Sequence, residues 1–264
     1  MDSTRTAVVT GAGGGLGRAI TAELTRRGYT VWATGVTEPA GEGLKTVVLD
    51  VTDVRACRAL ADAVVAEHGR LDLWVNNAGV LATGYAWEVD DAANEHVMAV
   101  NATGTINGTN AALAHMVPAG RGLVINIVSM AGIVATPGQA VYAASKHAAM
   151  AYTLSAAFDL RRGGHRGITM CAVCPSGVWT PLVSGRVGNP EAAASFTAPL
   201  LTADDIGRVV GRLTERPRPV TVVPRRRAPM MRFVDLFPRL ALPLIPKVMR
   251  DARRRQDSLA RKVG

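Results

Sequence analysis

The sequence has few cysteines, few aromatic residues and no long apolar run. Its three cysteines are too few for a disulfide framework, and their odd number is typical of a reducing compartment. Aromatic residues make up only 5% of the chain, so its core must consist mainly of Ala, Val and Leu. No run of about 18 apolar residues occurs, which excludes a membrane-spanning helix. A strand-like segment, residues 6–10, begins close to the first residue, and no apolar stretch precedes it. We therefore expect no signal peptide and a cytoplasmic location.

Charge is balanced over most of the chain and strongly positive at its C-terminal end. Residues 225–264 contain 12 basic and 3 acidic residues, whereas the rest of the chain contains 18 of each. The net charge of +9 therefore belongs to this tail alone. A nucleic-acid-binding tail would combine such charge with stacking aromatic residues, but Phe233 and Phe237 stand in an apolar context. We expect no nucleic-acid partner.

Short apolar runs alternate with amphipathic stretches along most of the 264 residues. This alternation predicts an α/β fold with a doubly wound parallel sheet (a Rossmann fold) of about seven strands and helices on both faces. The expected strands are residues 6–10, 30–34, 46–50, 71–76, 123–129, 168–174 and 220–223. The expected helices are residues 16–27, 54–68, 102–116, 142–160 and 204–214.

The texture changes near Arg216, where prolines become frequent. We expect residues 1–224 to form a Rossmann-type dinucleotide-binding and catalytic domain, and residues 225–264 to form a basic, apolar C-terminal extension. Prolines at 238, 243 and 246 make a long continuous helix unexpected in this extension.

A glycine cluster lies where the first expected strand meets the first expected helix. Gly11, Gly15 and Gly17 form the pattern G-x-x-x-G-x-G, with Leu16 inside it. Glycine allows the backbone to turn tightly and approach a pyrophosphate, whose charge is met by free N–H groups at the start of the helix. A plain flexible turn is the alternative interpretation of a glycine cluster, and its position in the first strand–helix unit favours the phosphate site.

Further motifs follow in order, and together they resemble the short-chain dehydrogenase/reductase family, in its single-domain branch with a Y-x-x-x-K motif. These motifs are Asn76-Asn77-Ala78-Gly79, Asn101, Ser129, Tyr142 with Lys146, and residues 175–180, where Ser176 replaces the usual Gly. The resemblance covers about residues 5–223. It implies an NAD(P)-dependent oxidoreductase that transfers hydride between a nicotinamide cofactor and a secondary alcohol or ketone.

Tyr142 and Lys146 are four residues apart on one expected helix, so their side chains share a face. A lysine ammonium beside a phenol favours the phenolate, so we expect a lowered pKa for Tyr142 and a role as the catalytic acid/base. The resemblance implies that Ser129 hydrogen-bonds the same substrate oxygen and that Lys146 also holds the nicotinamide ribose. It further implies that Asn101 orders a chain of water molecules behind Lys146. A non-catalytic cofactor-binding scaffold or sensor with the same fold is the alternative function, and the presence of both Tyr142 and Lys146 argues against it.

The expected cofactor-binding set extends the catalytic one. Its members are Gly11, Gly15, Leu16, Gly17, Asp50, Val51, Asn77, Ala78, Gly79, Tyr142, Lys146, Pro175, Val178 and Thr180. Asp50 and Val51 close the third expected strand, where the resemblance implies contact with the adenine. The alternative interpretation of Asp50 is a simple turn residue at a strand end. The cofactor is NADP or NAD. Gly35 stands where an acid would select NAD. The basic residues that would bind a 2′-phosphate are missing as well, since Gly14 and Val36 occupy their places. The absence of a repelling carboxylate, with Thr34 and Thr37 nearby, favours NADP.

Two other patterns have no functional interpretation. Cys171 and Cys174 form C-x-x-C inside an expected strand, where residues three apart point to opposite faces, so we expect core packing. The five histidines lack metal-ligand spacing. His147 is expected on a helix surface, with a place at the edge of the pocket as the alternative. The sequence therefore implies no metal.

The substrate and the partners are less directly specified. Residues 179–201 should form a flap over the pocket, with apolar neighbours from two loops, which favours a small lipophilic alcohol or ketone. The residues expected to line it are Trp179, Leu182, Val183, Val187, Phe196, Leu200, Val80, Leu81, Ile133 and Val134. The alternative is that they only pack the flap. Family resemblance implies a homodimer built from the helices after Ala102 and Tyr142, or a homotetramer that also pairs around the last strand.

The extension has two interpretations. Its apolar residues between basic clusters suit peripheral contact with an anionic membrane surface. For a cytoplasmic protein this is the inner surface of the membrane. They suit equally a tail folded over its own body or over a partner subunit.

Overall fold

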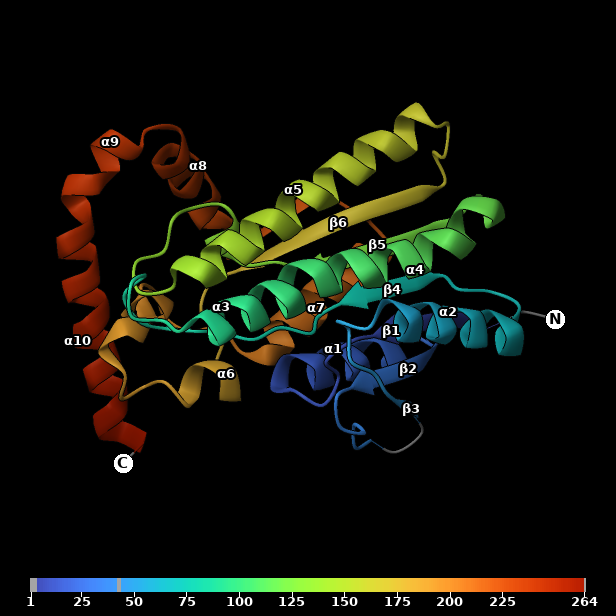
Figure 1. The fold of residues 1–264 in the computed structure, drawn as a ribbon, viewed down its shortest axis with the longest axis horizontal. Helices are drawn as coiled ribbons and strands as arrows, with labels where there is room; N and C mark the ends of the chain where they lie inside the picture. Colours follow the sequence, from blue (N-terminus) through green and yellow to red (C-terminus); the bar gives the residue numbers. More distant parts are fainter. Residues whose placement is uncertain (1–3, 42–43, 264) are drawn as a thin grey trace.

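Seven short apolar segments form one parallel sheet in the computed structural model, which describes residues 4–41 and 44–263 (Figure 1). The strands are β1 (Arg5–Val9), β2 (Tyr29–Gly35), β3 (Lys45–Val48), β4 (Leu73–Asn76), β5 (Gly122–Ile127), β6 (Ile168–Pro175) and β7 (Val220–Val223). Their order is β3-β2-β1-β4-β5-β6-β7, and every neighbouring pair is parallel. The expected doubly wound fold is confirmed. The order reverses between β1 and β4, and a crevice at this point of an α/β sheet is the usual ligand site.

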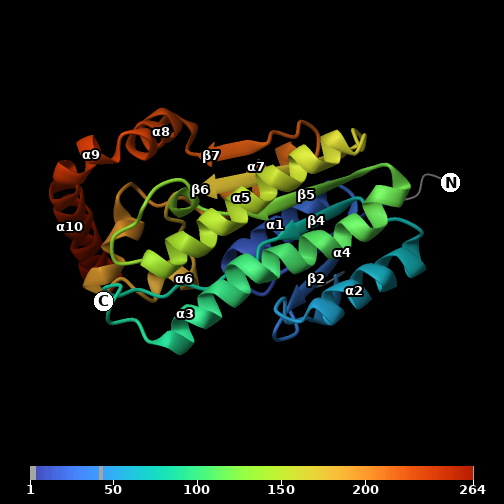
Figure 2. The same ribbon diagram turned by 45° about the horizontal axis from the view of Figure 1, so that its top comes forward.

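Helices cover both faces of the sheet (Figure 2). Helices α1 (Gly15–Arg26) and α7 (Ala203–Leu213) pack on one face. Helices α2 (Val54–His68), α4 (Gly104–Ala119) and α5 (Ala140–Arg162) pack on the other. The alternation of side chains along a strand produces both cores: Ala7 and Val9 of β1 face α1 and α7, whereas Val8 faces α2 and α4.

Local signals set several helix ends. The Asp53 carboxylate accepts hydrogen bonds from the backbone N–H groups of Arg55 and Ala56, which caps α2. Thr202 and Asp205 form a capping box at the start of α7. Gly28, which the sequence places just after α1, has a φ of 79° that favours glycine.

The expected helix at residues 102–116 is wrong in its N-terminal boundary. The structure has α3 (Asp91–Met98), then a π-helical turn η1 (Ala99–Thr103), then α4. The three elements run on without a break, and the turn contains Asn101. Single π turns inside helices often occur at functional sites, and a 3.6-residue periodicity does not reveal them.

The C-terminal extension is helical, contrary to the expectation of no long helix. It contains η4 (Arg225–Arg227), α8 (Ala228–Leu236), α9 (Pro238–Ala241), η5 (Leu242–Leu244) and the 19-residue α10 (Ile245–Val263). Each proline lies in the first turn of one of these elements, where its missing N–H would have no partner in any case. The last proline, Pro246, is the second residue of α10, so the helix continues unbroken after it.

Helix α10 packs against the flap of the protein's own body. The flap contains α6 (Pro181–Ser184) and η3 (Pro190–Phe196). Gln256 is fully buried and donates hydrogen bonds through Nε2 to the carbonyl oxygens of Arg186 (3.1 Å) and Asn189 (2.6 Å). Within residues 4–41 and 44–263, no helix is long and apolar enough to cross a bilayer. The division into a domain of residues 1–224 and an extension stays a prediction.

Candidate active site

A cavity of about 730 Å³ runs from the glycine turn after β1, past the ends of β4, β5 and β6, to the helices of the extension. It therefore lies at the carboxyl ends of the strands, where the sheet order reverses. It collects nearly all of the predicted site residues. Those that line it are Gly11, Gly15, Leu16, Gly17, Asp50, Val51, Asn77, Ala78, Gly79, Ser129, Tyr142, Lys146, Pro175, Val178 and Thr180.

The glycine turn leaves no room for side chains. Gly11 has a φ of 63°, and a Cβ on it would lie 2.7 Å from the Cα of Ala78. A Cβ on Gly17 would lie 2.2 Å from the carbonyl oxygen of Gly11. Helix α1 begins at Gly15 with Gly14 as its N-cap, and no side chain caps its N–H groups. The first turn of α1 therefore presents free donors and the positive end of the helix dipole to the cavity.

Hydrogen bonds between two strand ends hold this turn in place. The Thr10 hydroxyl accepts bonds from the backbone N–H groups of Asn77 (3.0 Å) and Ala78 (3.1 Å). Asn77 Nδ2 in turn donates to the carbonyl oxygens of Thr10 (2.9 Å) and Gly11 (3.1 Å). Asn77 Oδ1 is buried and has no hydrogen-bond partner in the part of the chain that the structure describes. Because buried polar atoms are nearly always hydrogen-bonded, this acceptor fits a donor from a bound group such as a dinucleotide.

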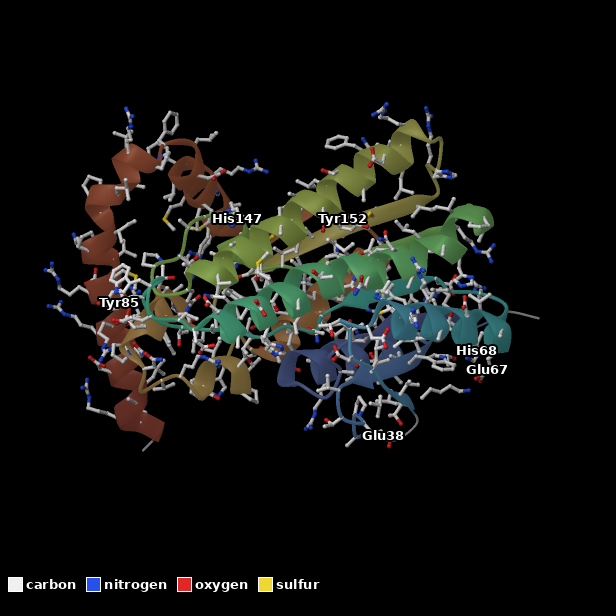
Figure 3. All side chains as sticks on the ribbon, viewed as in Figure 1. Glu38, Glu67, His68, Tyr85, His147 and Tyr152 are labelled. Atoms are coloured by element: carbon white, nitrogen blue, oxygen red, sulfur yellow. The ribbon has the colours of Figure 1, made fainter. Side chains whose placement is uncertain are left out.

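The expected adenine end of the cavity is lined by Asp50 and Val51. The Asp50 carboxylate accepts hydrogen bonds from the backbone N–H (2.9 Å) and hydroxyl (2.8 Å) of Thr52, so Asp50 also has the structural role of a turn residue. Gly35 and Val36 border this end and contribute no charge. The next acid along the chain, Glu38, accepts a 2.6 Å hydrogen bond from Thr46 and does not line the cavity (Figure 3).

Ser129, Tyr142 and Lys146 come together from β5 and α5. Ser129 follows β5, and its hydroxyl accepts a 3.1 Å hydrogen bond from Ala131 N. Lys146 lies one turn after Tyr142, with Nζ 5.8 Å from the centre of the tyrosine ring. Lys146 is 4% exposed, and Nζ donates a 3.0 Å hydrogen bond to the carbonyl oxygen of Ile127. The three side chains thus share one cavity wall.

Burial has the largest effect on the pKa values of Lys146 and Tyr142. It lowers the pKa of Lys146 to about 8, because the charged amine is removed from water. Burial raises the pKa of the Tyr142 phenol, and a hydrogen bond with Ser129 lowers it by a smaller amount. The expectation that Lys146 lowers the pKa of Tyr142 is therefore wrong for the polypeptide alone. The loss of hydration outweighs any lysine contribution.

Asn101 does not line the cavity, and its side chain holds the backbone behind it. Oδ1 accepts a hydrogen bond from Val80 N, and Nδ2 donates to Val80 O, both at 2.9 Å. Nδ2 also lies 3.0 Å from the Ser145 hydroxyl, which donates to the Tyr142 carbonyl oxygen at 2.7 Å. A Cβ on Gly79 would lie 3.2 Å from Asn101 Oδ1 and 3.5 Å from Lys146 Nζ. Asn101 thus connects the loop after β4 with the helix that carries Tyr142.

The flap is partly as expected. Leu182, Val183, Val80, Leu81 and Val134 line the cavity. The other expected lining residues, Trp179, Val187, Phe196, Leu200 and Ile133, do not. Phe196 is 1% exposed and packs with the flap and α10, which is the packing alternative, whereas Trp179 is 39% exposed.

Several lining residues escaped the sequence analysis. They are His96, Gln139, Ser195, Thr197, Arg227, Met231, Val234, Ala241, Ile245 and Met249. Six of these ten residues belong to the extension, and no local pattern indicates that a proline-rich tail returns to the pocket. Gln139 is 4% exposed and donates a 2.8 Å hydrogen bond to the Ser195 hydroxyl, which joins the flap to the start of α5.

The cysteine pair lies in the core, and His147 lies on the surface. Cys171 packs with the α1 and α7 side of the sheet, whereas Cys174 packs in a separate cluster with Met231, as expected for opposite faces. His147 is exposed, with Nδ1 2.8 Å from the Ala143 carbonyl oxygen (Figure 3). Among the described residues, no group of three or more His, Cys, Asp or Glu side chains could hold a metal ion.

Comparison with known proteins agrees with this geometry. The family model described as short chain dehydrogenase matches residues 5–189. The chain belongs to the short-chain dehydrogenase/reductase family. It is accordingly an oxidoreductase that acts on CH–OH groups, in a family that uses NAD(P).

Relatives in this family act on different substrates. The chain is 36% identical to a 2-(R)-hydroxypropyl-CoM dehydrogenase of Xanthobacter autotrophicus, over 71% of this chain and 80% of that protein. It is 30% identical to a 3-oxoacyl-[acyl-carrier-protein] reductase of Haemophilus influenzae, over 78% and 93%. A solved short-chain dehydrogenase/reductase of Burkholderia phymatum, in complex with NAD, superposes with a TM-score of 0.78 at 25% identity, over 90% of this chain and 95% of that one.

Proposed function

We propose that this dehydrogenase transfers hydride between NAD(P) and a lipophilic secondary alcohol or ketone, with Tyr142 as the catalytic acid/base. The observation that carries the proposal is the position of Ser129, Tyr142 and Lys146 in the wall of the cavity that begins at the glycine turn. A cofactor bound along the turn would reach these three side chains without leaving the cavity.

The chain's own residues supply binding and proton transfer. The free N–H groups of the first turn of α1 would hold the pyrophosphate, while Asp50 and Val51 contact the adenine and Asn77 Oδ1 accepts a donor. When bound, NAD(P) supplies or accepts the hydride. Tyr142 donates a proton to the substrate oxygen in reduction and removes it in oxidation, and Ser129 donates a hydrogen bond to the same oxygen.

Lys146 has two tasks in this proposal. Its amine is buried next to the loop after β4, where it would hold the nicotinamide ribose. Its charge, with that of an oxidised nicotinamide, would oppose the effect of burial on the Tyr142 phenol. Asn101 acts as a positioning residue, because its hydrogen bonds reach Val80 and Ser145.

The proposed cofactor preference is NADP. The lining residues Gly35 and Val36 carry no carboxylate that would repel a 2′-phosphate, and Glu38 is directed to Thr46. The proposed substrate class follows from the walls beyond Tyr142. They are formed by Leu81, Val134, Leu182, Val183 and the apolar side chains of the extension. Such walls exclude water and suit an apolar substrate better than a sugar.

The test compares Tyr142→Phe with Tyr152→Phe, a matched control further along α5 whose hydroxyl bonds Asn110 and which does not line the cavity (Figure 3). We expect oxidation of NADPH by lipophilic ketones to fall by about 100-fold or more in Tyr142→Phe, the scale of general acid–base catalysis. Cofactor binding, measured by fluorescence titration, should persist in both variants.

Near-normal turnover in Tyr142→Phe would remove Tyr142 from the mechanism. Cofactor binding by the wild-type protein, without turnover across a broad panel of ketones and alcohols, would favour the scaffold or sensor function instead.

A further inference from the structure

Exposed apolar side chains are concentrated in one short part of the molecule. We call residues 228–248 the apolar arch; it contains α8, α9, η5 and the start of α10, which stand at one end of the molecule (Figures 1 and 2). Eight of the sixteen large hydrophobic side chains that are exposed among the described residues belong to it. They are Met230, Phe233, Leu236, Phe237, Leu240, Leu242, Leu244 and Val248. Such a concentration on a folded surface usually marks a docking site.

The arch is a thin wall between the cavity and the exterior. Met231, Val234, Ala241 and Ile245 line the cavity from the inside. Leu236, Phe237, Leu240 and Leu242 do not line the cavity and are 50–70% exposed. Four others, Met230, Phe233, Leu244 and Val248, line the cavity and are also exposed. Apolar surface therefore continues from the outside of the arch into the cavity.

Positive charge surrounds these apolar residues. Residues 225–250 contain seven basic residues and a single acidic one, Asp235. Arg232, Arg239, Lys247 and Arg250 are exposed among the apolar side chains. The pKa of Arg227 is lowered by its burial and by the nearby charges of Arg255 and Arg226. The arch is thus an apolar surface with a basic border.

We propose that the apolar arch docks on an anionic lipid bilayer and that the cavity mouth it borders opens towards that bilayer. Apolar side chains that enter the interface between basic residues are the arrangement of a segment that lies on a membrane rather than crosses it. A bilayer supplies both an apolar layer for the leucines and a negative surface for the arginines.

A second copy of this chain fits the arch less well. A two-fold contact brings the same surface of both copies together, so the basic borders would face each other. Like charges brought together at an interface oppose association. The anionic bilayer has the complementary charge.

The proposal that the arch docks on a bilayer rests on the arch alone. Delivery of a lipophilic substrate from the bilayer into the cavity rests also on the proposed function. Two readouts separate them. Vesicle binding needs no catalysis, and turnover of a short, water-soluble ketone needs no membrane. Loss of the first with retention of the second isolates the arch.

Co-sedimentation of the full chain with vesicles is the first experiment. We expect about tenfold or greater preference for vesicles of phosphatidylcholine with phosphatidylglycerol over phosphatidylcholine alone, and a loss of this preference at high salt.

Leu236→Ser/Leu240→Ser/Leu242→Ser should reduce binding about tenfold or more, since it removes only outward apolar side chains. Arg232→Gln/Arg239→Gln should reduce it without touching apolar surface. The matched control, Val48→Ser/Arg55→Gln/Arg58→Gln, changes exposed residues of β3 and α2 and should bind as the wild type does.

A label at the arch gives a direct readout. The three native cysteines are fully buried, and burial raises the pKa of each thiol to about 11 or 12, so an added surface cysteine reacts selectively. An environment-sensitive fluorophore on Leu240→Cys should shift to the blue with anionic vesicles, whereas the same label on Val48→Cys should not.

Three results would overturn the proposal. They are equal binding to neutral and anionic vesicles, equal shifts at both labelled positions, and a lower molecular mass of the triple leucine variant in light scattering without lipid. The last would assign the arch to a contact between copies.

Discussion

At the scale of a single residue, the burial of the Lys146 amine in the site lowers the free energy of unfolding. The residue is 4% exposed, its amine donates a hydrogen bond to the Ile127 carbonyl oxygen, and burial lowers its pKa to about 8. In the unfolded chain the pKa returns to about 10.5. Between these values the unfolded state binds more protons, so the free energy of unfolding rises with pH there. Below about pH 8 the amine is charged in both states, and the folded protein bears the full cost of burying the charge.

Lys146→Met should therefore stabilise the cofactor-free protein near neutral pH by about 3 kcal/mol or less, the free-energy equivalent of the pKa shift. The methionine has a similar length and leaves no buried charge. The gain should shrink as pH rises from about 8 to about 10.5, while turnover is lost at every pH. Chemical denaturation of both proteins across this range measures it. Parallel stability curves, with a constant difference, would contradict a lowered lysine pKa.

Gly35 and Val36 test the cofactor preference at the same scale. Gly35→Asp places a carboxylate at the end of β2, where it would repel a 2′-phosphate, so the ratio of NADP to NAD affinity should fall by about tenfold or more. Its Cβ would lie 3.0 Å from the Thr37 carbonyl oxygen, so thermal unfolding must be recorded for each variant. Val36→Arg, at a position that is 71% exposed, should move the ratio the other way. A wild-type protein that binds NAD more tightly in side-by-side titrations would refute the preference.

Helix α10 matters at the scale of elements, because it attaches the extension to the flap. Gln256 donates to two flap carbonyl oxygens, and Arg255 Nη1 donates to the Thr197 carbonyl oxygen at 2.8 Å. Ala252, which is fully buried, belongs to the same packed side of the helix. The flap and the extension therefore close the cavity as one unit.

Gln256→Ala should loosen that unit. It removes two side-chain hydrogen bonds, each worth about 0.5–1.5 kcal/mol, while the Arg186 and Asn189 carbonyl oxygens keep their backbone donors, the N–H groups of Asn189 and Ala192. We expect faster amide hydrogen exchange in the flap and in α10, and a higher KM for lipophilic ketones with little change in kcat. Arg254→Ala, an exposed change on the same helix, is the control. Unchanged exchange in Gln256→Ala would mean that other contacts hold α10 in place.

Assembly belongs to the scale of the whole molecule. Helices α4 and α5 lie side by side on one outer face, where the hydroxyl of Tyr152 donates a 2.6 Å hydrogen bond to Asn110 and Phe158 is 64% exposed. We expect this face to form the interface of a homodimer, or one of the interfaces of a homotetramer, as the family resemblance implies. Light scattering at micromolar concentration should give the mass of two or four chains.

Phe158→Arg should lower that mass, because it places a charge in the expected interface. Trp87→Arg, at a position that is 80% exposed on a loop, should leave it unchanged. A wild-type protein that is monomeric under these conditions would contradict the expected assembly.

Local sequence determined the strands, most helices and the glycine turn, because these depend on periodicity and on neighbours in the chain. The capping box of Thr202 and Asp205 and the opposite faces of Cys171 and Cys174 are examples. Many predicted site residues could also be placed at strand ends, where a parallel sheet brings them to one edge, and Tyr142 and Lys146 could be placed on one face of a helix.

Tertiary structure alone decided three other features. The pKa of Tyr142 depends on how deeply the phenol is buried, which no motif states. At the π turn, the Asn101 side chain forms hydrogen bonds with Val80 and Ser145, which lie in distant segments of the chain. The extension returns to line the cavity through Met231 and Ile245, because α10 packs on the flap. Each of these results from contacts between residues far apart in the chain, and such contacts leave no periodic signal in the sequence.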